Sequence, residues 1–222
     1  MTASCFQQNF SGPIMYDFPV NIGTSRHEND VLAVLARLQR IGVPTNPIAF
    51  YGSSSFRIWS SVTEDLGSLD IVNLGFGGGT YLSASHYLHQ LLVPLRPGKV
   101  VLYFGENDIA SDGLKAGTTL RHLQDLRDGI SRTLPQAEVF VLAIKPSPAR
   151  WIYRHEFDLF NQMARDWCES RDRTTWCDPN AGLLGENGLP MFRCYLPDLV
   201  HLNAAGYAVW SEAFRNASGL LN

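Results

Sequence analysis

The sequence predicts one α/β domain, a three-layer α/β/α sandwich around a parallel sheet of five strands. Three observations support this fold class. Five short runs are almost continuously apolar, as expected for parallel strands that are covered on both faces. Segments with helical spacing of apolar residues separate these runs, and a length of 222 residues suits a single α/β domain.

The composition excludes several classes of protein. Apolar residues make up 45% of the chain and charged residues 18%, which is an ordinary mixture for a globular domain with a real core. The formal net charge of −3 gives no indication of a nucleic-acid or membrane-surface partner. The N-terminus has neither a basic start nor a long apolar run, and no stretch approaches the ~20 apolar residues that span a bilayer.

The cysteines point to a reducing compartment. Four cysteines are too sparse for a disulfide framework in a chain of 222 residues, and none forms a C-x-x-C pair. We therefore expect idle or buried thiols, and we expect a cytoplasmic location mainly because no export signal is visible. The four are Cys5, Cys168, Cys177 and Cys194.

The first 45 residues are expected to form an extension that packs on the domain. Residues 1–25 contain several glycine and proline breakers and read as irregular. Residues 26–41 have helical spacing of apolar residues, and Gly42 with Pro44 ends that helix. We expect this extension to belong to the same domain, so that residues 1–222 form one unit.

Strands and helices then alternate to the end of the chain. Alternation at this spacing predicts right-handed βαβ units and one parallel sheet. Pro94 and Pro135 end the first two of the later helices, and Asn203 is expected to cap the last one. The predicted strands are 48–52, 70–74, 99–104, 138–144 and 174–178, and the later helices are 80–92, 114–134, 153–171 and 204–217.

Polar residues follow the strands at the places where a parallel sheet positions its active site. Ligands of such sheets bind beyond the carboxyl ends of the strands, so the segments after the apolar runs are the candidates. A fourth segment lies just before the last helix. The four segments are Gly52-Ser53-Ser54-Ser55, Gly75-Phe76-Gly77-Gly78-Gly79, Gly105-Glu106-Asn107-Asp108 and Asp198-Leu199-Val200-His201.

Together these segments contain the groups that acyl transfer requires. A serine hydroxyl becomes an effective nucleophile when a base takes its proton, and histidine is the usual base. Asp198 lies three residues before His201 and can reach the second imidazole nitrogen through a tight turn. Glycine N–H groups and the amide of Asn107 can stabilise the oxyanion that forms.

The same segments resemble the SGNH hydrolases, also called the GDSL family of esterases and lipases. Gly52-Ser53-Ser54 matches the Gly-Asp-Ser block, and Asn73 to Gly78 matches the Asn-x-Gly-x-x-Gly turn. Gly105 to Asp108 matches Gly-x-Asn-Asp, and Asp198 to His201 matches Asp-x-x-His. The resemblance covers roughly residues 47–215, in order and after the expected elements.

The resemblance implies a role for each matching residue. It assigns Ser54 as nucleophile, His201 as base and Asp198 as the orienting acid. It also assigns the N–H groups of Ser54 and Gly78, with the side chain of Asn107, to the oxyanion hole. It implies a flavodoxin-like strand order of 2-1-3-4-5, a small-molecule ester as substrate, and no metal or organic cofactor.

One position departs from the family pattern. Ser53 stands where the family has aspartate, so the polar contacts that brace this turn must differ. Three consecutive serines also leave the register open. Ser54 fits best as the nucleophile, Ser53 is second and Ser55 third.

Residues outside the four blocks are also candidates. The segment 145–150 follows the fourth strand, and two prolines stiffen it. Arg150 and Trp151 are therefore candidates for shaping the substrate pocket. We expect Asp108 to hold its loop, and His86 and His89 to be packing or surface residues because no third metal ligand accompanies them.

The predicted function is a serine esterase that hydrolyses carboxylic esters with short acyl chains. The alternatives within the fold are an acyltransferase, a lysophospholipase or thioesterase, and a non-catalytic carbohydrate- or lipid-binding relative. A dinucleotide-binding domain is a weaker alternative, because its fingerprint needs a glycine at position 80 and this sequence has Thr80 there.

Overall fold

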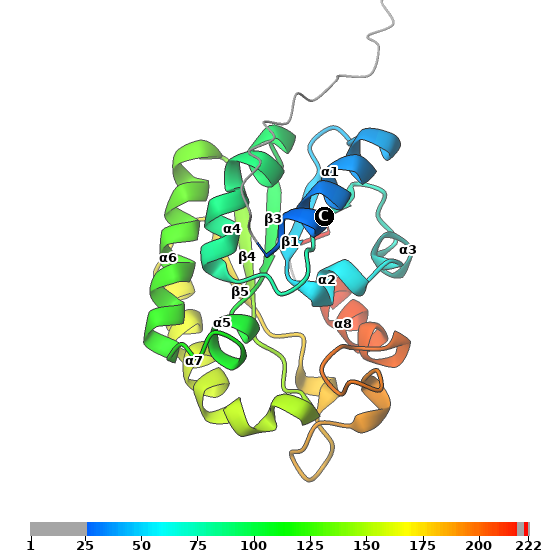
Figure 1. Ribbon diagram of the computed structural model, residues 1–222, viewed down its shortest axis with the longest axis vertical. Helices are drawn as coiled ribbons and strands as arrows, with labels where there is room; N and C mark the ends of the chain where they lie inside the picture. The colour runs from blue at the N-terminus through cyan, green and yellow to red at the C-terminus, as the bar shows by residue number, and fades with distance from the viewer. Residues whose placement is uncertain (1–25, 217–219, 222) are drawn as a thin grey trace, which may run out of the picture.

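A parallel sheet of five strands forms the centre of the molecule (Figure 1). The computed structural model describes residues 26–216, 220 and 221. The strands are β1 (Ile48–Gly52), β2 (Ile71–Asn73), β3 (Lys99–Tyr103), β4 (Glu138–Leu142) and β5 (Thr174–Cys177). Their order is β2-β1-β3-β4-β5, which confirms the predicted fold class and strand order.

Helices cover both faces of the sheet (Figure 1). One face packs against α1 (Glu28–Ile41), α4 (Tyr81–Tyr87), α6 (Ala116–Thr133) and α7 (Arg154–Glu169). The other packs against α2 (Ser54–Ile58), α3 (Val62–Leu66) and α8 (Ala204–Asn216), while α5 (Glu106–Ala110) follows β3.

Alternating side chains of the strands build the two cores. In β1, Ala49 and Tyr51 belong to the core on the α1 face, whereas Ile48 and Phe50 belong to the core on the α8 face. Every residue of β1 is buried, because the strand lies between two neighbours in the sheet and two layers of helices. This two-sided burial is the physical reason why the strands are continuously apolar in sequence.

The core on the α8 face is rich in aromatic rings. Trp59 stacks on Tyr207 with ring centroids 4.9 Å apart, and Phe214 stacks on the same indole at 5.9 Å. Such pairs add stability beyond the area that they bury. They fix α8 against the segment that follows β1, and so they connect the end of the chain to the first strand.

One predicted helix differs from the structure in detail. The predicted helix 80–92 is α-helical up to Tyr87 and then continues as a π-helix over Leu88–Leu92 and a 3-10 turn over Val93–Leu95. Pro94 has no N–H to extend an α-helix, so the chain leaves α geometry near it. Between β5 and Asp198 the chain also forms two 3-10 turns, Ala181–Leu183 and Phe192–Cys194.

The N-terminal prediction is tested in part. The helix expected over residues 26–41 is α1, and it buries Val31, Val34, Leu35 and Leu38 against the domain. Residues 1–25, with Cys5, lie outside the described residues. The extent of the domain over residues 1–222 therefore stays a prediction. Within the described part of the chain, no helix has the length and apolar character needed to cross a bilayer.

Three cysteines lie in the described ranges, and all three are free thiols. Burial raises the pKa of Cys168 to about 12 and that of Cys177 to about 11, so both remain protonated at neutral pH. The cytoplasmic location stays a prediction.

Gly75 provides a test of how tightly the fold holds the segment after β1. A Cβ atom at Gly75 would lie 2.2 Å from the backbone nitrogen of Arg57 in α2. We predict that Gly75→Ala destabilises the fold by about 1–3 kcal/mol, the usual scale for overpacking. Denaturant unfolding measures this loss.

Gly117→Ala is the matched control. Gly117 lies in the first turn of α6 with no atom within 4 Å of an added Cβ, so alanine should stabilise the helix by up to about 1 kcal/mol. Equal effects of the two substitutions would contradict the prediction.

Candidate active site

Ser54 lies at the end of β1, as the first residue of α2. The preceding Ser53 has extended backbone angles (φ −85°, ψ −159°), and its N–H donates to the carbonyl of Tyr103 at 3.0 Å. From the far end of the chain, the hydroxyl of Tyr207 donates to the carbonyl of Ser55 at 2.7 Å. The backbone on both sides of Ser54 is therefore fixed by its neighbours.

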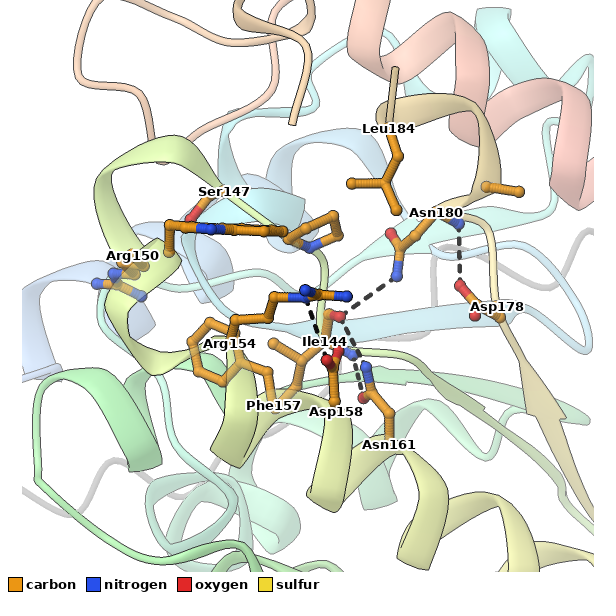
Figure 2. A pocket seen from close by; sticks show the side chains of 13 residues that line it. Ile144, Ser147, Arg150, Arg154, Phe157, Asp158, Asn161, Asp178, Asn180 and Leu184 are labelled. Carbon is orange, nitrogen blue, oxygen red and sulfur yellow. Dashed lines mark hydrogen bonds and ion pairs between the residues drawn. The ribbon is translucent and has the colours of Figure 1, made fainter. Parts of the chain in front are cut away.

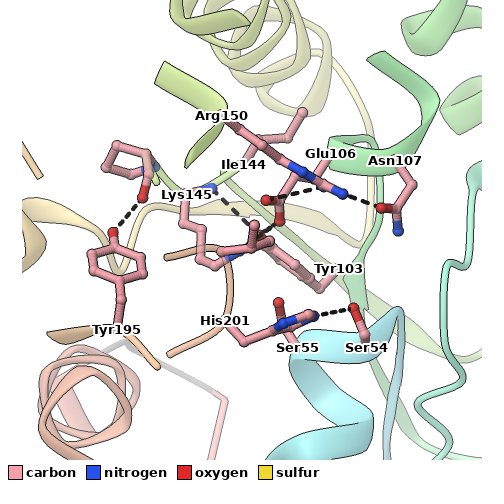
Figure 3. A network of polar contacts seen from close by, with 12 residues as sticks. Ser54, Ser55, Tyr103, Glu106, Asn107, Ile144, Lys145, Arg150, Tyr195 and His201 are labelled. Atoms are coloured by element: carbon pink, nitrogen blue, oxygen red, sulfur yellow. Dashed lines mark hydrogen bonds and ion pairs between the residues drawn. The ribbon is translucent and has the colours of Figure 1, made fainter. Parts of the chain in front are cut away.

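His201 lies next to Ser54 (Figure 3), and Asp198 lies next to His201. The Nε2 atom of His201 is 2.8 Å from the Oγ of Ser54, and Nδ1 is 2.6 Å from an Oδ atom of Asp198. The other Oδ atom of Asp198 accepts the N–H groups of Val200 and His201 at 2.9 and 3.0 Å. Serine, histidine and aspartate thus form one continuous chain of hydrogen bonds.

The carboxylate of Asp198 is held in its ionised form. Partial burial raises its pKa, but the hydrogen bonds from the imidazole of His201 and from two backbone N–H groups outweigh burial and lower the pKa to about 2. A charged Asp198 at neutral pH favours a proton on Nδ1 of His201 and leaves Nε2 as the acceptor toward Ser54.

The turn without the family aspartate is buried. Ser53 is 2% exposed, and its side chain makes no capping hydrogen bond to α2. Of the three consecutive serines, Ser54 is the one whose hydroxyl meets the imidazole. The sequence left open which of the three serines faces the base, and in the structure Ser54 lies beside His201.

The glycine-rich loop and Asn107 lie together at the same edge of the sheet. Asn73, at the end of β2, accepts the N–H of Gly75 at 2.9 Å and donates to the carbonyl of Phe56 at 2.7 Å. The amide nitrogen of Asn107 donates to the carbonyl of Gly79 at 3.0 Å. The segments after β1, β2 and β3 therefore contact one another.

Asp108 contacts the backbone of its surroundings. It is fully buried, and its carboxylate accepts the N–H groups of Tyr81 and Gly105 at 3.1 and 3.0 Å. These bonds join the start of α4 to the start of α5. This contact pattern is the one expected of a residue that holds the loop.

A buried group of charges behind Asn107 was not predicted from the sequence. We call Glu106, Lys145, Arg150 and Tyr103 the charge cluster (Figure 3). Glu106 contacts the Nζ of Lys145 at 2.6 Å, the Nη1 of Arg150 at 3.2 Å and the hydroxyl of Tyr103 at 2.9 Å. Lys145 is fully buried. The available sequence signal was a charged residue close behind each of two predicted strands, with Glu106 two positions after 99–104 and Lys145 one position after 138–144.

The charge cluster favours ionised Glu106. Burial raises the pKa of this carboxyl, but Lys145 and Arg150 together outweigh burial and bring the pKa below its ordinary value. A buried carboxylate of this kind is stable because cations and a hydroxyl surround it.

Arg150 joins the charge cluster to Asn107. Its Nη1 donates to the Oδ1 atom of Asn107 at 3.1 Å, which identifies the oxygen side of that amide. Because Nδ2 donates to Gly79, both ends of the Asn107 amide are held. One N–H of Nδ2 remains for another acceptor.

Arg150 and Trp151 also line a pocket of about 140 Å³ (Figure 2). Phe157, Asn161 and Asn180 contribute to the same wall. The guanidinium of Arg154 covers the ring of Trp151 at 4.7 Å. Arg150 is thus shared between the charge cluster and this pocket, as Figures 2 and 3 show.

No group of three or more metal-ligating side chains occurs within residues 26–216, 220 and 221. His86 and His89 accordingly have no metal-binding partners among the described residues.

The comparisons with known proteins agree with the fold and identify the class of protein. Residues 41–209 match the model of the GDSL-like lipase/acylhydrolase family, which is most of the chain. The chain belongs to this family and is a carboxylic ester hydrolase. No curated protein matches the sequence.

Solved structures show the same fold at low sequence identity. A protein assigned as a platelet activating factor from Streptococcus pneumonia is 22% identical, with a TM-score of 0.72 over 85% of this chain and 92% of that one. A GDSL-like lipase from Bacteroides thetaiotaomicron is 15% identical, with a TM-score of 0.68 over 84% and 96%. A family 3 carbohydrate esterase from Clostridium thermocellum is 17% identical, with a TM-score of 0.63 over 79% and 96%.

The charge cluster gives a stability prediction. Glu106→Gln should destabilise the fold by about 3–5 kcal/mol at neutral pH, because it leaves the buried Lys145 without its counter-ion. Because the pKa of Glu106 is lowered by folding, its contribution is complete above about pH 4.5 and is lost as the pH falls through the folded-state pKa. Denaturant unfolding between pH 3 and pH 7 measures both effects.

The double variant Glu106→Gln/Lys145→Met is the control. It removes the uncompensated ammonium, so it should be more stable than Glu106→Gln alone. If the double variant lost as much unfolding free energy as Glu106→Gln and Lys145→Met lose together, the two charges would not be coupled.

Proposed function

We propose that this protein is a serine esterase that hydrolyses carboxylic esters with short acyl chains through a Ser54–His201–Asp198 triad and an acyl-enzyme. The observation that carries the proposal is the continuous hydrogen-bond chain from Ser54 Oγ through both imidazole nitrogens to Asp198. Membership of the acylhydrolase family supports the reaction class.

In the first step Nε2 of His201 takes the hydroxyl proton while the Oγ of Ser54 attacks the ester carbonyl carbon. The ionised Asp198 stabilises the imidazolium that results. The tetrahedral intermediate collapses, and the alcohol leaves with the proton from His201. Water, activated by the same imidazole, then releases the acid from Ser54.

The oxyanion of the tetrahedral intermediate needs donors that are already in place. We assign this role to the N–H groups of Ser54 and Gly78 and to Nδ2 of Asn107. The contact from Arg150 supports the last assignment, because it fixes which end of the Asn107 amide is the donor. Arg150 and Trp151 are also proposed to bound the substrate site, because Arg150 contacts Asn107 and both residues line the adjoining pocket.

Short acyl chains enter the proposal from the sequence, and the pocket of about 140 Å³ does not set the acyl length. Its lining contains neither Ser54 nor His201, and it adjoins the site only through Arg150, whose guanidinium contacts Asn107. Lysophospholipase and thioesterase activity on longer chains stay alternatives. Acyl transfer to an alcohol remains an alternative, since the same acyl-enzyme serves both outcomes.

Two non-hydrolytic alternatives have less support. A non-catalytic binding module would not need an imidazole 2.8 Å from a serine hydroxyl. A dinucleotide site would need several free N–H groups in succession, but those of Gly75, Phe76 and Gly77 already donate within the protein. Neither a nucleic acid nor a membrane is part of the proposed function, and its partner is a small-molecule ester.

Ser54→Ala should nearly abolish hydrolysis of a short aryl ester without changing the unfolding midpoint appreciably. Loss of the nucleophile removes the acyl-enzyme route. Initial rates and labelling by a fluorophosphonate measure the effect. The matched control is Ser55→Ala, which should keep both the hydrolytic activity and the labelling. Full activity of Ser54→Ala, or equal losses in the two variants, would refute the assignment.

Asn107→Ala should raise the activation barrier by about 3 kcal/mol, the scale for one oxyanion donor, and lower kcat by roughly 100-fold. The comparison is made by steady-state kinetics on the same ester. A loss below about twofold would mean that Asn107 only supports the loop.

Substrate range is tested by hydrolysis of esters with acyl chains from acetyl to palmitoyl. The proposal expects the highest kcat/KM at the short end of the series. Product analysis with and without an added alcohol separates hydrolysis from acyl transfer. Preference for palmitoyl esters would contradict the short-chain assignment.

A further inference from the structure

The start of α1 contacts the glycine-rich loop from outside the region that matches the family. The matched region begins at residue 41, whereas His27 and Asp30 precede it. Both side chains bind the same residue of the loop, Gly77. The family blocks that the chain matches do not account for these contacts.

The two contacts hold both polar groups of Gly77. Its carbonyl oxygen lies 2.9 Å from Nδ1 of His27, and its N–H donates to a carboxylate oxygen of Asp30 at 2.5 Å. His27 is 5% exposed, and its ring packs edge-on against Phe76 with centroids 5.4 Å apart. The imidazole is therefore confined as well as hydrogen-bonded.

The direction of the hydrogen bond to Gly77 follows from the second ring nitrogen of His27. Nε of Arg26 donates to Nε2 of His27 at 3.1 Å, and a guanidinium can only donate. Nε2 is thus the acceptor nitrogen, and Nδ1 carries the proton that is donated to the Gly77 carbonyl. Burial lowers the pKa of His27, which favours this neutral form.

Holding this carbonyl also fixes the next N–H. The carbonyl of Gly77 and the N–H of Gly78 belong to one planar trans peptide, so they point in opposite directions. With the carbonyl directed at α1, the N–H of Gly78 is directed away from it. Among the described residues this N–H donates to none.

We propose that His27 and Asp30 are positioning residues that orient the Gly77–Gly78 peptide, so that the N–H of Gly78 is preorganised to bind the oxyanion. This inference rests on the proposed function. It adds α1 to the active site, although α1 contributes no atom that touches the substrate.

The surroundings of the peptide support this assignment. The loop is held against the site by Phe76, whose N–H donates to the carbonyl of Gly52 at 3.1 Å, and by the bond from Asn107 to Gly79. Asp30 also lies 3.5 Å from Nε of Arg57 in α2, the helix that begins at Ser54. Asp30 thus connects the oxyanion loop to the helix of the nucleophile.

The test compares two substitutions of His27 in the full chain. Asparagine places an N–H near the position of Nδ1, whereas leucine fills similar space without a donor. We expect His27→Leu to lower kcat on a short aryl ester by about 10–100-fold, up to the effect of one oxyanion donor, with KM changed less than twofold. His27→Asn should retain kcat within about fivefold of the wild type.

Leu38→Ala is the matched control for general loosening of α1. Leu38 is buried on the same helix and far along it from the loop, so its truncation should lower stability by about 2–5 kcal/mol and leave kcat unchanged below the melting temperature. Asp30→Asn keeps an acceptor oxygen and Asp30→Ala does not, so this second pair tests the inference if His27→Leu fails to fold.

The outcomes separate the inference from the proposed function. Unchanged kcat in His27→Leu and Asp30→Ala, equal losses in His27→Leu and His27→Asn, or an equal loss in Leu38→Ala would overturn the positioning role. In each of these cases, loss of hydrolysis in Ser54→Ala would still support the proposed function. A wild-type protein that neither hydrolyses the ester nor reacts with a fluorophosphonate would overturn both.

Discussion

The parallel pairing of β1 with β2 on one side and β3 on the other is the constraint on which the site depends. Phe50 pairs with Asn73, and Gly52 pairs with Tyr103, so the three strands end at one edge of the sheet. The segments that follow them carry Ser54, the glycine-rich loop and Asn107. The pairing is possible because β1 is buried on both faces and presents apolar side chains to two cores.

Glu106 and Lys145 are buried near this edge, so each charge needs a partner. Glu106 lies between Lys145 and Arg150, and the cluster orients Asn107 through the guanidinium. The glycine-rich loop is held in a similar way, because His27 and Asp30 at the start of α1 bind the backbone of Gly77. Around the groups proposed to react, a second layer of residues fixes amides and peptides in single orientations, which is what preorganised catalysis requires.

His201 is positioned by the turn before α8, whereas the other groups follow the ends of strands. It follows a turn at Leu199, whose φ of 57° is unusual for a residue with a side chain, and it precedes α8. Asn203 accepts the N–H groups of Ala205 and Gly206 at the start of that helix, as the sequence predicted for its cap. The aromatic contacts between α8 and Trp59 then bring the end of the chain to β1.

The sequence by itself determined the strands, the main helices and the four segments that meet at the sheet edge, because apolar periodicity and turn residues are local signals. Tertiary structure alone decided which of three serines meets His201, how Glu106 and Lys145 pair, and that α1 binds Gly77. These outcomes depend on contacts between residues far apart in the chain, such as the 147 positions from Ser54 to His201. No local pattern encodes such distances, since they are set by how the helices pack on the sheet.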